Sequence, residues 1–376
     1  MKLFIVRHIL LCSAIVMWVA FSVAPTVADD DTLSDVFREI LRNPQDSTLN
    51  WRYAEIAEDR GALGNALAAY ERILAHRPGD EDARRESERL LSLLRAPKTE
   101  ARLSVGGLYE TNAPRRDDSL PSFNDWGLVG RFQIRHDRTI KDRRYRFAGD
   151  LYTRWYNRHE AGAFDFASAT AAPVFHLGNG WQVATGIGAA YANLKKDPLF
   201  GSLYAFAAFE STRPGPLRGV NVRAGYDSFD DRFAGRDAWV FSVDAPLVWS
   251  RLVTKGDRLL AIPRYVHNRA NGLGHINRFH EAGAQFDYVM PLSTTWRLSG
   301  GLSFLATYRW YAGHAPDQAN NRRDWRFVPG VRLTVNEILD SDLSVTLGFA
   351  REQNQSNDGD KRYKNRTYSL VASWKF

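Results

Sequence analysis

Residues 101–376 alternate between apolar and polar residues in short segments, and this pattern constrains the fold more than any other feature. Clusters of Gly, Pro, Asn and Asp separate the segments, which is typical of strands joined by turns. In one segment, for example, Trp126 and Leu128 share a face that opposes Arg131. The pattern has the two-residue period of a β-strand, so this part of the chain is predicted to be all-β.

By this signature the region holds about fourteen strands. They are expected to begin near Ala101, Asp125, Arg143, Ala163, Gly180, Gly201, Leu217, Arg236, Arg258, Phe279, Trp296, Asp324, Ser341 and Asn365. An even number of strands is expected for a bacterial outer-membrane barrel, whose outer face is apolar and whose lumen is polar. A soluble sandwich alternates too, but here many aromatic residues lie near strand ends, as in the girdles at membrane interfaces.

The connections between the strands fall into two sets of different length. The tight set comprises residues 138–142, 177–179, 214–216, 291–295 and 336–340. The longer and more polar set comprises residues 113–124, 268–278, 312–323 and 351–364. Short periplasmic turns and long extracellular loops are expected of an outer-membrane barrel with both termini in the periplasm, so the connections favour a membrane barrel.

The last strand alternates up to the final residue of the chain. Tyr368, Leu370, Trp374 and Phe376 share one face. An alternating aromatic strand that ends in Phe resembles the signal read by the barrel-assembly machinery, which is therefore an expected partner along with outer-membrane lipid. An ordinary edge strand is the alternative, but natural proteins seldom leave a long apolar edge strand exposed.

The N-terminus has the layout of a secretory signal peptide. Lys2 and Arg7 precede an apolar run, which ends in small residues at Ala28. This run is short for a membrane anchor, and cleavage after Ala28 is expected. Cleavage would also remove Cys12, the only cysteine, so the mature chain would have no disulfide and no thiolate ligand.

The charge of the chain does not indicate nucleic-acid binding. Removal of Lys2 and Arg7 from the 50 basic residues leaves 48 against 43 acidic ones, a formal charge of +5. No stretch is dense enough in Lys and Arg to suggest a phosphate-binding tract. After the signal no run is long and apolar enough for a transmembrane helix, so a protein that spans the membrane must do so as a closed barrel.

Residues 31–95 have helical periodicity and few β-branched residues. Pro44 and Pro78 lie 34 positions apart in similar Pro-x-Asp turns, and this is the tetratricopeptide period. The residues expected to pack such a repeat are Ala54, Gly61, Ala66, Tyr70 and Pro78. An ordinary helical hairpin is the alternative, because fewer than three repeats rarely stand alone.

Arginine is frequent on the face of the strands that is predicted to point inward. The expected lumen-lining residues are Arg131, Arg135, Arg144, Arg146, Arg154, Asp150, Arg223, Asp227, Arg264, Glu281, Asp287, Arg297, Arg326 and Arg332, together with Asp244 and Arg309. A wall of mixed sign is expected in any barrel with a polar lumen. A pathway for a polar or anionic passenger is the second interpretation.

Enzymatic activity and bound cofactors are not expected. The sequence has no Gly-x-Ser-x-Gly, His-Glu-x-x-His or phosphate-binding Gly-Lys-Ser/Thr motif, and it has no dinucleotide fingerprint. His267, His275 and His280 gather around one predicted external loop. Without a cysteine or an acidic residue at a diagnostic spacing, they are interpreted as solvated loop residues, and no metal site is expected.

A family resemblance follows from these features. A signal peptide, a short tetratricopeptide segment and a barrel of this strand number resemble the surface lipoprotein assembly modifiers, or Slam proteins. The stretch from Leu103 to Ala113 resembles the opening strand of that family's barrel, where Gly-Tyr-acid-Ser-Asn is common, although Leu108 replaces Gly and Thr111 replaces Ser. The helical segment is shorter than is usual in the family.

The resemblance implies export or display of a client protein, either a surface lipoprotein or a secreted haem- or metal-acquisition protein, with the helical segment as docking surface. An exopolysaccharide export porin and a general solute porin are the alternatives. The chain is thus predicted to be an α+β multidomain protein of the outer membrane. It would comprise a signal peptide (1–28), a periplasmic all-α tetratricopeptide-like domain (29–97) and an antiparallel transmembrane β-barrel of about fourteen strands (98–376).

Overall fold

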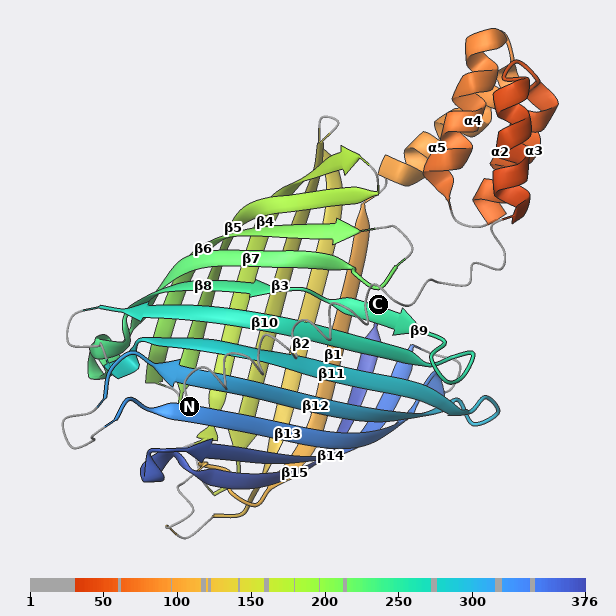
Figure 1. The fold of residues 1–376 in the computed structure, drawn as a ribbon. Coiled ribbons are helices and arrows are strands. Elements are labelled where there is room, and N and C mark those ends of the chain that lie inside the picture. The colour runs from red at the N-terminus through yellow and green to blue at the C-terminus, as the bar shows by residue number, and fades with distance from the viewer. Residues whose placement is uncertain are drawn as a thin grey trace. The chain divides into compact units, whose positions relative to one another are not determined.

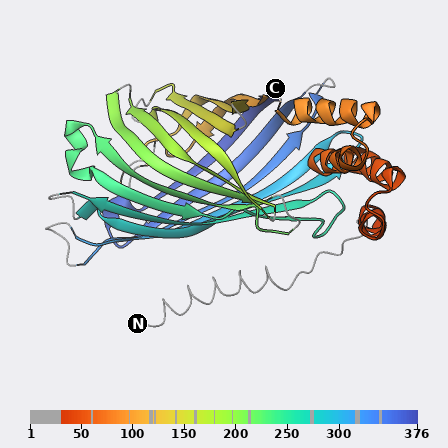
Figure 2. The same ribbon diagram turned by 90° about the horizontal axis from the view of Figure 1, so that it is seen from above.

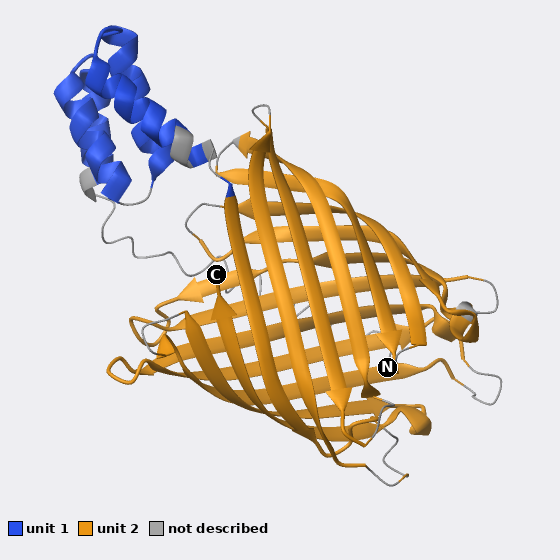
Figure 3. Cartoon of the chain, turned by 180° about the vertical axis from the view of Figure 1, so that it is seen from behind, with its two compact units in different colours: residues 1–97 blue, residues 98–376 orange. Residues whose placement is uncertain are grey.

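In the computed structural model the chain divides into two compact units, residues 1–97 and 98–376 (Figure 3). The described residues are 31–59, 62–95, 97–115, 120, 123–140, 143–158, 162–178, 180–195, 197–211, 215–271, 276–314, 320–338 and 342–376. The expected signal peptide and its cleavage site lie outside these residues. No helix in these ranges is long and apolar enough to cross a membrane.

The described residues of the first unit form four helices (Figure 1). They are α2 (Asp31–Arg42), α3 (Ser47–Asp59), α4 (Leu63–His76) and α5 (Glu81–Arg95). The two Pro-x-Asp turns work alike, because each aspartate caps the helix that follows it. Asp46 Oδ1 accepts from the backbone N–H of Thr48 at 2.9 Å, and Asp80 Oδ1 accepts from that of Ala83 at 3.0 Å. A side-chain oxygen there satisfies a free N–H of the first helical turn.

The core of the helical unit is aliphatic and closely packed. Ala54 and Ala66 are fully buried, and Tyr70 packs against the edge of Trp51 with ring centroids 4.8 Å apart. Burial raises the pKa of Tyr70, and its hydrogen bond to Glu58 raises it further. Pro78 lies exposed in the turn before α5. Gly61 lies outside the described residues, and the tetratricopeptide assignment stays a prediction.

The second unit is a closed antiparallel barrel (Figures 1 and 2). Its strands are β1 (Lys98–Glu110), β2 (Asp125–Ile140), β3 (Arg143–Tyr156), β4 (Phe164–Gly178), β5 (Trp181–Leu194), β6 (Asp197–Ser211), β7 (Gly219–Phe229), β8 (Ala238–Asp244), β9 (Leu247–Ser250), β10 (Arg258–Ala270), β11 (Phe279–Ser293), β12 (Leu298–Tyr311), β13 (Arg323–Val335), β14 (Leu343–Ser356) and β15 (Tyr363–Lys375). Apart from β8 and β9, which both pair with β10, each strand pairs with its neighbours in sequence, and β15 pairs with β1 to close the ring.

The barrel has fourteen strand positions, as the sequence predicts, although fifteen strand segments are distinguished. β8 and β9 both pair with β10, and residues 245–246 separate them, so they share one position. The interruption falls at Pro246, which has no backbone N–H to donate to a ladder. Pro246 still accepts a hydrogen bond from Arg218 N–H at 2.9 Å.

The outer wall of the barrel is apolar. Large side chains project from alternate positions of the strands, and Ile187 and Leu203 are 73% and 72% exposed. Trp126 and Trp155 lie edge to face near one end of β2 and β3, with centroids 6.4 Å apart. An apolar band with aromatic residues near its border is the surface that a membrane barrel presents to lipid.

The two ends of the barrel differ in their connections. We call the end where β1 begins and β15 finishes the terminal end, and the opposite one the long-loop end. One predicted loop is wrong in extent: most of residues 351–364 is strand, because β14 continues to Ser356 and β15 begins at Tyr363. Both faces of these strand ends carry polar side chains, so in sequence they look like a loop. The connection between β5 and β6, also at the long-loop end, is short.

One turn at the terminal end is held by a single carboxylate. Asp257 is 2% exposed and accepts hydrogen bonds from the backbone N–H groups of Leu252, Val253 and Thr254 and from Tyr288 Oη. Burial opposes ionisation of Asp257, but these donors outweigh it and lower its pKa to about 2. The turn between β9 and β10 is therefore ordered by a buried anion.

Candidate functional site

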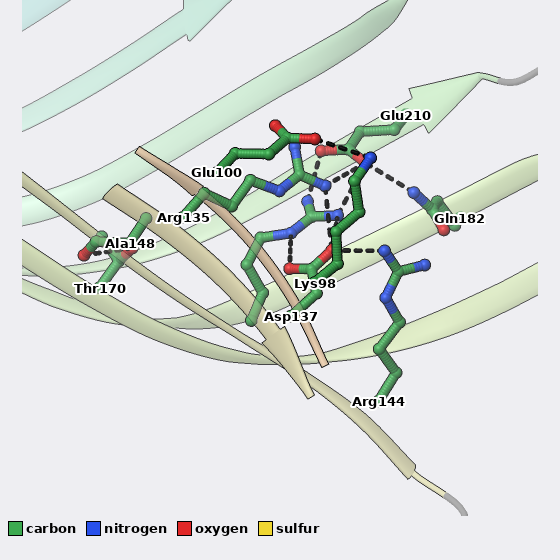
Figure 4. A network of polar contacts seen from close by, with 10 residues as sticks. Lys98, Glu100, Arg135, Asp137, Arg144, Ala148, Thr170, Gln182 and Glu210 are labelled. Carbon is green, nitrogen blue, oxygen red and sulfur yellow. Dashed lines mark hydrogen bonds and ion pairs between the residues drawn. The ribbon is translucent and has the colours of Figure 1, made fainter. Parts of the chain in front are cut away.

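The inner wall of the barrel near the terminal end carries a cluster of charged side chains (Figure 4). At its centre Asp137 of β2 has a side chain only 5% exposed. It accepts from Arg146 at 3.0 Å and from Arg135 at 3.3 Å, and it also pairs with Arg144. Asp137 thus holds together three guanidinium groups from β2 and β3.

The same cluster reaches across the wall to β6. Glu210 pairs with Arg146, accepts from Gln182 of β5 at 2.6 Å, and lies 3.8 Å from Arg135. β3 and β6 are separated by two strands, so their side chains meet only across the concave side of a curved wall. These contacts therefore show which face of the strands points inward, and the exposed apolar side chains occupy the other face.

A hollow of about 690 Å³ lies beside this cluster on the inner wall. Its floor is made of small side chains, including Ala148, Ser168 and Thr170. Both signs of charge surround it, because Arg102 and Lys375 line it together with Asp150. The hollow offers a polar solute space and charged contacts at the terminal end.

A second cluster lies near the long-loop end and centres on Glu110 of β1. Its side chain is 3% exposed. It accepts hydrogen bonds from Asn365 at 3.0 Å and Thr367 at 2.9 Å, both on β15, and also from the hydroxyl of the fully buried Tyr156. Glu110 thus connects β15 to β3 across the seam where the ring closes.

Glu352 of β14 is the other anion of the long-loop cluster. It accepts from Arg326 at 2.7 Å and from the hydroxyl of Tyr363 at 2.8 Å. Arg115, which follows β1, lies between the two anions, 3.0 Å from Glu352 and 3.4 Å from Glu110. A described part of the connection after β1 is therefore fixed to the wall of the barrel by two ion pairs.

Further ion pairs lie on the inner wall outside the two clusters. Arg131 pairs with Asp150 at 2.5 Å, Arg309 with Glu281 at 2.6 Å, and Arg332 with Asp287 at 2.5 Å. Each of these pairs joins neighbouring strands or strands two positions apart. These ion pairs thus connect side chains that stand close together on the inner wall.

Most of the arginines and acids proposed for the lumen lie in the inward register of their strands. Besides those above, this holds for Arg154, Arg223, Asp227, Asp244, Arg264 and Arg326. The position of Arg297 differs from the prediction. It lies in the turn before β12 with a φ of 48°. It contacts Glu337 of the neighbouring turn at 3.4 Å and does not line the wall.

The anions at the centres of the two clusters are not among the lumen residues predicted from the sequence. Asp137, Glu210, Glu110 and Glu352 each stand in the inward register, in phase with the arginines of the same or the next strand. Their position in the same two-residue alternation as the arginines was the signal by which the sequence could have indicated them. Which arginine each anion would meet depends on strand pairing, which one sequence does not give.

Two of the three candidate histidines lie side by side on the outer wall. The Nδ1 atoms of His267 and His280 are 3.2 Å apart, and Tyr265 Oη lies 2.7 Å from His280 Nδ1. His280 stacks on Trp310 with centroids 5.2 Å apart. His275 lies outside the described residues. Within the described ranges no three His, Cys, Asp or Glu side chains are grouped to hold a metal ion.

Comparison with known proteins finds no matching family model and no matching curated protein. Several solved structures are similar. Pseudomonas aeruginosa OpdK, solved with vanillate, is 12% identical with a TM-score of 0.34, over 74% of this chain and 98% of that one. Pseudomonas aeruginosa OccD3 (OpdP) is 9% identical with a TM-score of 0.39, over 74% and 91%. A BenF-like porin from Pseudomonas fluorescens Pf-5 is 9% identical with a TM-score of 0.36, over 74% and 98%.

These values are too low to carry an argument about function. The evidence for the barrel is the closed set of strand pairings in this chain. The resemblance to the surface lipoprotein assembly modifiers is not confirmed by any of these comparisons.

Proposed function

We propose that this protein is an outer-membrane channel for small polar solutes. The observation that carries the proposal is the inner wall, where the described ion pairs join charged side chains of one strand or of strands that lie close together around the ring. Arg131 with Asp150 and Arg326 with Glu352 join adjacent strands, for example. A wall built in this way keeps its charges fixed and hydrated while polar solutes pass.

We also propose that the barrel lies in the outer membrane. The apolar outer wall fits lipid, and the signal-like N-terminus fits export from the cytoplasm. In this arrangement the terminal end and the helical unit are periplasmic, and the long-loop end faces outward. Assembly would use the barrel-assembly machinery acting on the last strand.

The test is single-channel recording with the purified full-length protein in planar lipid bilayers. We expect discrete conductance steps and an ion selectivity that changes when the terminal cluster is altered. Glu210→Gln removes a carboxylate that faces Arg146 and Arg135, so it should shift the selectivity towards anions. Glu337→Gln, in an exposed turn, is the matched control. A correctly folded barrel that inserts into the bilayer but never conducts would contradict the proposal.

A second candidate function is translocation of a protein client, as the resemblance to the assembly modifiers implies. The observation that favours it is the helical unit, where Phe37, Leu41 and Leu94 remain exposed. Exposed apolar side chains on stacked helices are suited to binding a peptide segment. Deletion of the gene followed by surface labelling of intact cells tests this function. If every surface and secreted protein is unchanged, translocation of a client is wrong.

A further inference from the structure

One arc of the inner wall carries no charged side chains. Neither β4 nor β5 places an Asp, Glu, Lys or Arg in the inward register. Between Gln182 and Leu194, the inward positions of β5 hold only alanine or glycine. β3 on one side and β7 on the other carry inward arginines. We call the inward faces of β4, β5 and β6 the uncharged arc, leaving out Glu210 at the terminal end of β6.

Aromatic side chains of β6 stand over this arc of small residues. Tyr204 and Phe206 both face inward, with ring centroids 6.5 Å apart. The ring of Tyr204 lies against the backbone of Gly188 so closely that a β-carbon there would overlap it. Nearer the long-loop end, Phe200 packs on Phe229 with centroids 5.4 Å apart. An aromatic surface next to a floor of alanine and glycine is suited to a flat apolar group.

A guanidinium is stacked on the Tyr204 ring, at the β7 side of this aromatic surface. Arg223 of β7 is the register partner of Phe206, and its Cζ lies 3.8 Å from the centre of the Tyr204 ring. Its Nη2 donates to Ser202 Oγ at 2.9 Å.

The charge of Arg223 is less closely neutralised than that of Arg131. The nearest carboxylate in an ion pair with it is Asp227, at 3.7 Å, whereas Arg131 and Asp150 are 2.5 Å apart. The Arg223 side chain is 35% exposed, so a ligand can reach it. The edge of the uncharged arc therefore offers a positive charge that a ligand anion could share.

We propose that the uncharged arc and Arg223 form a binding site for small organic anions with a planar apolar body. The apolar body lies against Phe206 and the alanine and glycine floor, and the anionic group meets the guanidinium that is stacked on Tyr204. An inorganic anion makes no use of the aromatic surface. A sugar requires many hydrogen-bonding groups, and the floor of β5 offers few.

The proposal deepens the channel function, on which it rests for the role of the site in transport. Binding itself is independent of conduction and is measured separately. The probe is phenylacetate, titrated calorimetrically into the full-length protein in detergent. Phenylacetamide lacks the charge and acetate lacks the ring, so each removes one of the two proposed contacts. We expect both to bind at least about tenfold more weakly than phenylacetate.

The variants locate the site. Arg223→Gln should weaken phenylacetate binding about tenfold, and Arg223→Lys should restore part of it. Phe206→Leu should weaken it about threefold. Arg332→Gln removes an inward arginine from the far wall and should leave the affinity unchanged. Heat-modifiable migration on gels checks that each variant has a folded barrel.

Two results would overturn the site: phenylacetamide binding as tightly as phenylacetate, or Arg332→Gln weakening binding as much as Arg223→Gln. If Arg223→Gln does not fold, the three-ligand comparison on the unaltered protein still decides. Binding with the expected preferences but no conductance would overturn the channel and leave the site in place.

Discussion

The helical unit buries apolar side chains and exposes ion pairs, whereas the barrel exposes apolar side chains and turns its ion pairs inward. In the helical unit Ile40 and Ile73 are buried in a core, and the ion pair of Arg38 with Asp35 is on the surface. In the barrel Ile187 and Leu203 are exposed, and the ion pairs face inward. Both arrangements remove apolar surface from water, but the helices do so in their own core and the barrel does so in lipid.

The two units also differ in the interactions that hold them together. The helices are held by side-chain packing, since their hydrogen bonds are local. The barrel has backbone ladders between all neighbouring strands and little apolar packing inside. Its inner side chains mainly fix one strand against the next through ionic and polar contacts. Four predictions test this difference, in order of decreasing effect.

The largest effect is expected from the last strand, since only the barrel should depend on assembly into a membrane. Deletion of Phe376, whose backbone pairs with Ala101 in both directions, or Trp374→Ala should remove most of the assembled barrel from the outer membrane. The measurement is the amount of heat-modifiable protein in membrane fractions. Ser373→Ala is a neighbouring control on the inward face. Unchanged barrel levels in both variants would show that these residues are no assembly signal.

Glu352→Ala should be the most destabilising change within the assembled barrel. Its side chain is 7% exposed, and its loss leaves Arg115 and Arg326 without this partner. Breaking a buried pair by removing one partner costs about 3–5 kcal/mol, and the loss here should lie at the lower end of this range, because Arg326 is 42% exposed and Arg115 keeps its contact with Glu110. Denaturant unfolding in detergent, followed by tryptophan fluorescence, measures the loss. Glu337→Ala, which breaks an exposed pair, should cost less than about 1 kcal/mol. Equal losses would mean that burial does not distinguish the lumen from the surface.

The same large-to-small substitution, Ile to Ala, should have different effects on the stability of the two units. Ile73→Ala empties space in the helical core and should destabilise that unit by about 2–5 kcal/mol. Ile187→Ala on the outer wall leaves no cavity, and its effect should be smaller. Thermal loss of the far-ultraviolet helical signal and loss of the folded barrel band report on the two units in the same full-length protein. A larger loss of stability from Ile187→Ala than from Ile73→Ala would contradict the view that only the helical unit depends on a packed apolar core.

The smallest effect is expected from the turn before β10 and depends on pH. Because the pKa of Asp257 is lowered to about 2 in the folded barrel, its contribution to stability is complete above pH of about 4. The contribution is lost as the pH falls from there through the folded pKa. Asp257→Asn should therefore lower the midpoint of thermal unfolding at neutral pH, with a difference that shrinks towards pH of about 2. A difference that is constant with pH would mean that the charge of Asp257 plays no part.

Much of the fold follows from the alternation alone. The two-residue period of Trp126, Leu128 and Phe132 gives both a strand and its lipid-facing side, and the closed ring has the predicted fourteen positions. The interruption at Pro246 was missed, because Leu217 to Arg258 offers several places to begin a strand. The end of β14 could not be predicted, because Arg351, Gln353 and Gln355 make its outward face polar as well and the apolar–polar alternation stops there.

The candidate site was only partly accessible from the sequence. The inward arginines could be identified strand by strand, since each shares a phase with its neighbours. Glu110 could not be linked to Asn365, which is 255 residues away, until the ring is closed. No sequence motif marks the uncharged arc, because it is defined by the absence of charged residues from the inward positions of β4 and β5.

The seam between β1 and β15 has a consequence for how the chain folds. Ser104 and Ser373, whose hydroxyls are 2.8 Å apart, are separated by 269 residues, whereas the other strand pairs are near neighbours in sequence. Closing such a large loop costs the most chain entropy and must await synthesis of the final strand. The pairing of highest contact order thus comes last, and until then two open strand edges need protection from other chains.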